Sequence, residues 1–297
     1  MVPFSHTMLF RTLFAVVAAA ALGCGREDVN ATLQKVSQAR ELAAHLTVQF
    51  TMASDAANRA VMADTDEASV EFAKESREAT TSVQKDVDQL RDTLKTLGYA
   101  EEENLLSDFA RNFTGYRALD DNVLGLAVEN TNLKAQRLAF GPAQDAANAF
   151  RDALKTVTAA NAADAWHVEA LSATAVMTVR EIQVLQGPHI ADADEGVMTR
   201  MEQQMSTSQA AARKSLDALR PLVSAGSRAK LNAAASALKR FMELNAQLIA
   251  LSRRNTNVHS LMLSLDEKRK MTLACQDNLR SLQAALSRRG YSGIRER

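Results

Sequence analysis

The clearest indication of the fold class lies in residues 105–154, LLSDFARNFTGYRALDDNVLGLAVENTNLKAQRLAFGPAQDAANAFRDAL. Apolar residues recur three and four positions apart, as in a helix that buries one face along its whole length. The same spacing begins near Val29 and continues through most of the chain. With 46% hydrophobic residues but only four prolines and eleven glycines in 297 residues, the composition favours helices over strands and turns. The sequence therefore predicts an all-α fold and excludes collagen-like, disordered and polytopic membrane proteins.

Helix-end signals divide residues 28–158 into four helices. The segment Asp64–Asp66 offers N-caps, and Gly98 suits a left-handed residue at a helix C-terminus. Glu101–Glu103 favour the start of a third helix, because carboxylates stabilise the positive end of the helix dipole. Asn130-Thr131-Asn132 is interpreted as the turn before the fourth helix. Four helices of about 25–35 residues joined by short turns form an antiparallel bundle.

The pattern repeats at a constant offset of 125 residues. Asn130-Thr131-Asn132 matches Asn255-Thr256-Asn257, and leucines, alanines and aspartates on three helices match at the same offset. In the second copy, Gly187-Pro188 is expected to end the first helix. The sequence thus predicts two tandem antiparallel four-helix bundles with coiled-coil-like packing. Their predicted boundaries are residues 28–158 and 159–289, followed by a flexible tail at 290–297.

A three-helix repeat is the alternative. The seven-residue apolar phase continues across Asn130-Thr131-Asn132, so one long helix over residues 101–157 also fits, with a kink at Gly141-Pro142. We favour four helices because an Asn-Thr-Asn triplet is costly inside a helix and Thr131 or Asn132 caps one well.

Residues 1–24 resemble an export signal. Arg11 supplies a positive charge and Thr12–Leu22 an apolar core of about eleven residues, too short for the roughly twenty that span a bilayer. Small residues then precede Cys24, as at the processing site of bacterial lipoproteins, so Cys24 is the predicted lipidation site. Ordinary cleavage after Ala20 or Ala21 and an uncleaved short anchor are the alternatives.

The cysteines and histidines are not spaced as a catalytic or metal-binding site requires. Cys275 is the second of only two cysteines and is expected to be a lone buried thiol on a helix. The five histidines form no i, i+3 or i, i+4 pair, and neither a glycine-rich phosphate loop nor a nucleophile elbow is present. We therefore expect no catalysis, no metal and no cofactor. The formal net charge is zero and no run of basic residues alternates with aromatics, so we expect no nucleic-acid partner.

Two polar residues on the predicted apolar seams are the candidate ligand-binding residues. Arg137 lies on the inward stripe of the predicted fourth helix and Asp120 on that of the third. With a reversal at residues 130–131, the two would be offset by about 6 Å along the helices. Their pocket would bind a small carboxylate or an amino acid through Arg137. An internal ion pair, or an arginine that extends to solvent, is the alternative.

The stretch at 105–154 resembles the second half of the four-helix-bundle sensory domain of methyl-accepting chemotaxis receptors. The resemblance rests on the aromatic run Phe109, Phe113 and Tyr116, the following Arg117, and the segments DNVLGLA and FGPAQDAANAF. It implies a ligand-binding module on the outer side of a membrane. Members of that family continue into a second membrane span, a relay and a signalling coiled coil. These parts are not among the 297 residues, so signal output is expected to require a partner, such as a membrane protein.

The sequence as a whole predicts an exported, lipid-anchored sensory or ligand-binding helical protein in the periplasm or on the cell surface. The alternative is a structural or adaptor lipoprotein that binds a partner protein. An apolar stripe without an intramolecular partner, or stable self-association, would favour the adaptor. The sequence leaves open whether the protein forms a homodimer.

Overall fold

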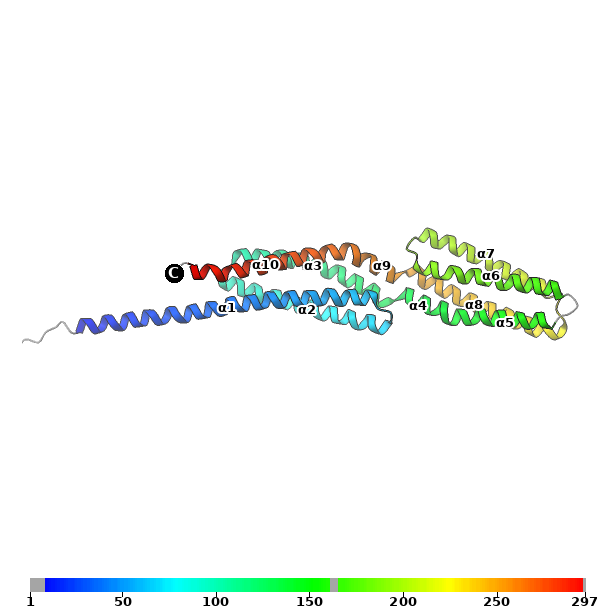
Figure 1. Ribbon diagram of the computed structural model, residues 1–297, viewed down its shortest axis with the longest axis horizontal. Coiled ribbons are helices and arrows are strands. Elements are labelled where there is room, and N and C mark those ends of the chain that lie inside the picture. Colours follow the sequence, from blue (N-terminus) through cyan, green and yellow to red (C-terminus); the bar gives the residue numbers. More distant parts are fainter. Residues whose placement is uncertain (1–8, 161–164, 296–297) are drawn as a thin grey trace, which may run out of the picture. The chain divides into compact units, whose positions relative to one another are not determined.

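The computed structural model describes the backbone of residues 9–160 and 165–295 and the side chains of residues 29–160 and 165–289. Within these ranges almost every residue is helical and none lies in a strand, which confirms the predicted all-α class. Figure 1 follows the helices along the chain. They are α1 (Leu9–Met62), α2 (Asp66–Leu97), α3 (Ala100–Glu129), α4 (Thr131–Leu138), α5 (Gln144–Ala159), α6 (Ala165–Ala191), α7 (Glu195–Leu219), α8 (Arg228–Arg254), α9 (Thr256–Leu263) and α10 (Arg269–Arg295). Two π-helical segments, η1 (Ala139–Ala143) and η3 (Ser264–Lys268), and a 3-10 turn, η2 (Ala225–Ser227), complete the described elements.

The first helix ends follow the predicted signals. The hydroxyl oxygen of Thr65 accepts a hydrogen bond from the Ala68 amide (3.1 Å), which caps α2. Gly98 has a φ of 67°, the left-handed conformation expected after α2. Glu101–Glu103 lie in the first turn of α3, where the helix dipole stabilises carboxylates.

Two predicted ends are wrong. Helix α6 continues past Gly187-Pro188 to Ala191. The missing amide of Pro188 removes one hydrogen bond of the last turns, but the Pro188 carbonyl accepts one from the Asp192 amide (3.0 Å). Helix α10 runs to Arg295, so most of the predicted tail at 290–297 is helical.

The chain divides into two compact units. Unit 1 comprises the described parts of residues 1–57, 73–120 and 266–297, and unit 2 comprises those of residues 58–72 and 121–265. The core of unit 1 is formed by α1, α2, α3 and α10. Its aromatic centre packs Phe50 edge-on against Phe109 and Tyr116, with ring centroids 5.9 and 5.0 Å apart.

Unit 2 has its own core between α5, α6, α7 and α8. The buried apolar side chains at its centre include Phe150, Ile182, Leu216 and Phe241, each no more than 5% exposed. Each unit is therefore a four-helix bundle, in agreement with the predicted type of packing.

The composition of the bundles differs from the predicted tandem arrangement. At the offset of 125 residues, α4–α5 of the first repeat corresponds to α9–α10 of the second. Helix α5 packs in unit 2, with the first three helices of the second repeat, while α10 packs in unit 1, with those of the first repeat. The two repeats thus exchange their fourth helices, and the predicted boundaries 28–158 and 159–289 do not correspond to the bundles.

The cause lies at Asn130, which was expected to lie in a reversing turn. Only this residue separates α3 from α4, whereas an antiparallel helix hairpin needs a loop of about two to five residues. The structure is closer to the alternative in which one long helix covers residues 101–157, but that helix is interrupted at Asn130. The predicted kink at Gly141-Pro142 is a π-helical segment, η1, which accommodates a proline inside the helix.

Asparagine suits both interruptions. Asn130 and Asn255 have φ values of 49° and 50°, in the left-handed region that asparagine tolerates better than most residues. These are the non-glycine residues with positive φ among the described ones, and they are 125 positions apart.

The residues that follow form a reciprocal cap within unit 2, which we call the Asn-Thr-Asn clasp (residues 130–132 and 255–257). The Thr131 amide donates to Thr256 Oγ1 (3.2 Å), and the Thr256 amide donates to Thr131 Oγ1 (3.1 Å). The amides of Asn132 and Asn257 donate in the same reciprocal way to each other's Oδ1, at 3.1 and 3.2 Å. Side chains of one helix N-terminus therefore satisfy the free amides of the other.

The two cysteines lie in different settings. Cys275 is free and fully buried in unit 1, as predicted, and burial raises the pKa of its thiol to about 12. Cys24, the predicted lipidation site, lies in the part of α1 whose side chains are outside the described residues.

Candidate functional site

The structure places Asp120 in a buried ion pair of unit 1. Its Oδ1 lies 2.7 Å from Lys268 Nζ, and both side chains are almost inaccessible to solvent (3% and 1% exposed). Ser76 donates a hydrogen bond to the other carboxylate oxygen (3.0 Å). The ammonium group also lies 5.5 Å from the centre of the Tyr116 ring. Burial lowers the pKa of Lys268, and the charge of Asp120 partly offsets this effect.

The sequence analysis missed Lys268, although a signal was available. Lys268 ends the π-helical segment η3, and its counterpart at the repeat offset is Ala143, which is fully buried at the end of η1. The repeat therefore places a lysine at a core position, where a charge requires a partner.

Arg137 lies in the other unit and has a different partner. Its Nη1 lies 3.0 Å from Oδ2 of Asp66, and its side chain is half exposed. Asp120 and Arg137 were expected to line one pocket, with an ion pair between them as the alternative. Asp120 belongs to unit 1 and Arg137 to unit 2, and each forms an ion pair with another residue. The expectation depended on the reversal at residues 130–131, which does not occur.

A second buried polar cluster centres on His189, which is fully buried in unit 2. Its Nδ1 lies 2.8 Å from Ser252 Oγ and its Nε2 lies 2.9 Å from Glu202 Oε1. Arg253 Nε donates to the same glutamate oxygen (2.6 Å), and this hydrogen bond holds the pKa of Glu202 below its ordinary value against the opposing effect of burial. The residues come from three helices, so no spacing in the sequence signalled the cluster.

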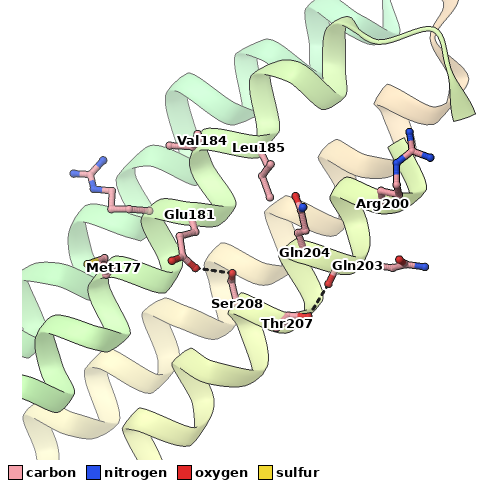
Figure 2. A pocket seen from close by; sticks show the side chains of 10 residues that line it. Met177, Glu181, Val184, Leu185, Arg200, Gln203, Gln204, Thr207 and Ser208 are labelled. Atoms are coloured by element: carbon pink, nitrogen blue, oxygen red, sulfur yellow. Dashed lines mark hydrogen bonds between the residues drawn. The ribbon is translucent and has the colours of Figure 1, made fainter. Parts of the chain in front are cut away.

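A groove of about 850 Å³ runs between α6 and α7 on unit 2. Figure 2 shows Leu185 of α6 and Gln204 of α7 pointing toward one another across it. Ser208 bridges the two helices by donating a hydrogen bond to Glu181 (2.8 Å). Helix α6 contributes three apolar and two charged residues to the lining, and α7 contributes polar residues and one arginine. The lining comprises Met177, Arg180, Glu181, Val184, Leu185, Arg200, Gln203, Gln204, Thr207 and Ser208.

A second groove of about 650 Å³ lies on the other side of α6, against α5. It shares Met177 and Arg180 with the first groove and adds Arg151, Lys155 and Glu169 among its charged residues. The outer face of α6 between the two grooves carries exposed Met177 and Val184. Arginine beside apolar surface is suited to an organic anion or to a protein partner.

Among the described residues, no three His, Cys, Asp or Glu side chains are grouped as a metal ion would require. Nor does any described helix have a run of apolar residues sufficient to cross a bilayer.

Comparison with known proteins gives one family. The model of a four-helix-bundle sensory module for signal transduction matches residues 27–176, from α1 into α6. No curated protein and no solved structure matches the chain. The matched span is slightly more than half of the 297 residues, and it includes helices that the fold distributes between units 1 and 2. The resemblance at residues 105–154 is thereby confirmed, and the chain belongs to the family of four-helix-bundle sensory modules of chemoreceptor type.

Proposed function

We propose that the protein is an exported, lipid-anchored sensory module that binds a small organic acid or amino acid, performs no catalysis, and passes its signal to a partner protein. Family membership supports the sensory part. The signal-like residues 1–24 support export, a location in the periplasm or at the cell surface, and an anchor at Cys24.

The groove between α6 and α7 is the proposed ligand site, and its composition is the observation that carries the proposal. Arg180 and Arg200 supply guanidinium donors for a carboxylate, while Met177, Val184 and Leu185 supply apolar surface for the rest of the ligand. Such a mixture suits a small organic anion better than an inorganic one, because part of the binding free energy comes from apolar contact.

Thermal unfolding of residues 26–289 in the presence of carboxylic acids and amino acids tests the proposal. A ligand at about one hundred times its Kd stabilises the native state by about 2.7 kcal/mol, which raises Tm by several degrees. We expect a shift with one chemical class. Absence of a shift across the panel would contradict ligand binding.

Two arginine variants locate the site. Arg200→Gln removes a guanidinium from the groove and should abolish the shift. Arg137→Gln changes a half-exposed arginine paired with Asp66 and should preserve it. A shift lost in Arg137→Gln and kept in Arg200→Gln would move the site away from the groove.

The anchor has its own test. Mass spectrometry of the protein from membranes should find a lipid-modified N-terminal cysteine, and Cys24→Ala should release the protein from the membrane fraction. An unmodified Cys24 in membrane-bound protein would contradict lipidation.

The second candidate function is an adaptor that binds a partner protein without sensing a small molecule. The observation that favours it is the exposed apolar surface along α6, where Met177 and Val184 are 67% and 72% exposed. A ligand-induced rise in Tm distinguishes the two candidate functions, because an adaptor requires no small-molecule ligand.

A further inference from the structure

Helix α6 is apolar on two faces. Its inward face contributes Val168, Ala175, Val179 and Ile182 to the core of unit 2. Its outward face nevertheless exposes Trp166, Met177 and Val184, at 68%, 67% and 72%. A surface helix ordinarily places polar residues on its solvent side, so this second apolar face needs an explanation.

The outward residues follow the spacing of a coiled-coil seam. Six exposed positions are separated by steps of four, three, four, three and four residues, which is the a/d pattern of successive heptads. We call them the α6 seam: Trp166, Ala170, Ala173, Met177, Arg180 and Val184. The seam extends for about 27 Å at 1.5 Å per residue, enough for five turns of a second helix.

The seam is not a general property of the repeats. The equivalent positions on α1, 125 residues earlier, include charged or polar side chains at four of six places. They are Glu41, His45, Val48, Met52, Asp55 and Arg59. The apolar seam is therefore specific to α6.

The charge of Arg180 discriminates between the helices that could pack on the seam. Arg180 lies within it and donates one hydrogen bond to Gln183 Oε1 (3.2 Å), so a helix packed there must present an acidic group opposite or cover a guanidinium that has no counterion. In a parallel pairing with α6 of a second copy, Arg180 would face Arg180. In an antiparallel pairing centred on the seam it would face Ala170. Neither arrangement places an acidic residue at the seam position that faces Arg180.

The flanking grooves favour an acidic partner as well. Arg151 pairs with the adjacent Asp152. The other groove-lining charges are three cations and two carboxylates, namely Lys155, Arg180, Arg200, Glu169 and Glu181. A bilayer is a poorer match, because helices that lie in a membrane interface bury a broad apolar face whereas this stripe has the narrow width of a helix–helix contact.

We propose that the α6 seam docks a helix of a partner protein, packed in coiled-coil fashion, with an acidic side chain opposite Arg180. The proposal rests on the part of the proposed function that requires a partner for signal output. Met177, Arg180 and Val184 also line the α6–α7 groove, so the docked helix would cover the proposed ligand site. Ligand and partner would then alter each other's affinity by the same factor.

Trp166 reports directly on the seam, because it is the chain's single tryptophan. The probe is a three-heptad helical peptide with leucine at its seam positions and one glutamate placed to face Arg180. Its matched control has lysine in place of that glutamate. Added to the full-length protein, the glutamate peptide should shift Trp166 emission to the blue and bind about tenfold or more tightly than the lysine peptide, because like charges at an interface are strongly unfavourable.

Variants give the matched controls. Arg180→Glu should reverse the preference between the peptides, and Met177→Glu should weaken binding of the glutamate peptide about tenfold or more by placing a charge in the seam. Met52→Glu alters the equivalent exposed position on α1, which is 54% exposed, and should leave binding unchanged. Both methionines are exposed, so these substitutions leave the cores intact.

The proposal would be overturned if neither peptide shifted the emission of Trp166, or if both peptides bound with equal affinity. Two other results would also overturn it: an emission shift with phosphatidylglycerol vesicles in place of the glutamate peptide, or a concentration-dependent dimer that Met177→Glu abolishes. The last two would assign the seam to lipid or to a second copy. A ligand-induced rise in Tm without peptide binding would refute the docking alone. Peptide binding without such a rise would refute the ligand-binding part of the proposed function.

Discussion

Removing Lys268 should destabilise unit 1 strongly. In Lys268→Met the apolar volume of the side chain is approximately retained, but Asp120 stays buried without its cation. Its remaining partner in the cluster is Ser76, at 3.0 Å. Breaking a buried ion pair by removing one member costs about 3–5 kcal/mol, a large share of the 5–15 kcal/mol that typically separates native from unfolded proteins.

Replacing both members should cost far less. In the double variant Asp120→Leu/Lys268→Met neither charge remains to be desolvated, and buried ion pairs replaced by apolar residues of similar volume are often neutral or stabilising. The difference between the double variant and the sum of the single variants measures the coupling between the two side chains.

Urea unfolding followed by circular dichroism at neutral pH provides the measurement. Lys270→Met is the matched control, because Lys270 lies two residues further along the chain, in the first turn of α10, and pairs with Asp266 at the surface. We expect the unfolding midpoint of this control to match that of the unmodified protein. If Lys268→Met is as stable as Lys270→Met, the Asp120 carboxylate is not held as a buried charge and the reasoning is wrong.

Three further predictions concern other parts of the molecule. Asn132→Ala removes an amide that donates within the clasp and should lower the free energy of unfolding by about 1–3 kcal/mol, whereas the exposed Asn232→Ala should leave the urea midpoint unchanged. Burial alone would raise the pKa of Glu102, but hydrogen bonds from Arg289 and the backbone hold it below 4.5. The stability advantage over Glu102→Gln should therefore be complete above that pH and vanish as pH falls through the lowered pKa, as acid titrations of both proteins would reveal. Cys275, with its raised pKa and full burial, should react with a disulfide reagent only after unfolding, and rapid native reaction would contradict its placement.

The helices and most of the core positions could be predicted from the sequence alone. Helical periodicity is local, so the stripe that includes Phe109, Phe113 and Tyr116 could be predicted before any packing partner was known, and all three are buried. The caps of α2 and α3 are equally local, since each depends on side chains within one turn of the helix end. The repeat offset also came from the sequence, and the clasp joins residues at that same separation.

Which helices share a bundle could not be predicted from the sequence and depends on tertiary packing. The periodicity of α5 fits a core with α3 as well as one with α8, because an apolar stripe does not specify its partner. A single left-handed residue, Asn130, carries the chain onward without reversing it, and the two fourth helices are exchanged. For the same reason, Asp120 and Arg137 form ion pairs with other residues and not with each other. A buried charge requires a counterion, and which counterion lies within reach depends on helices far apart in the chain.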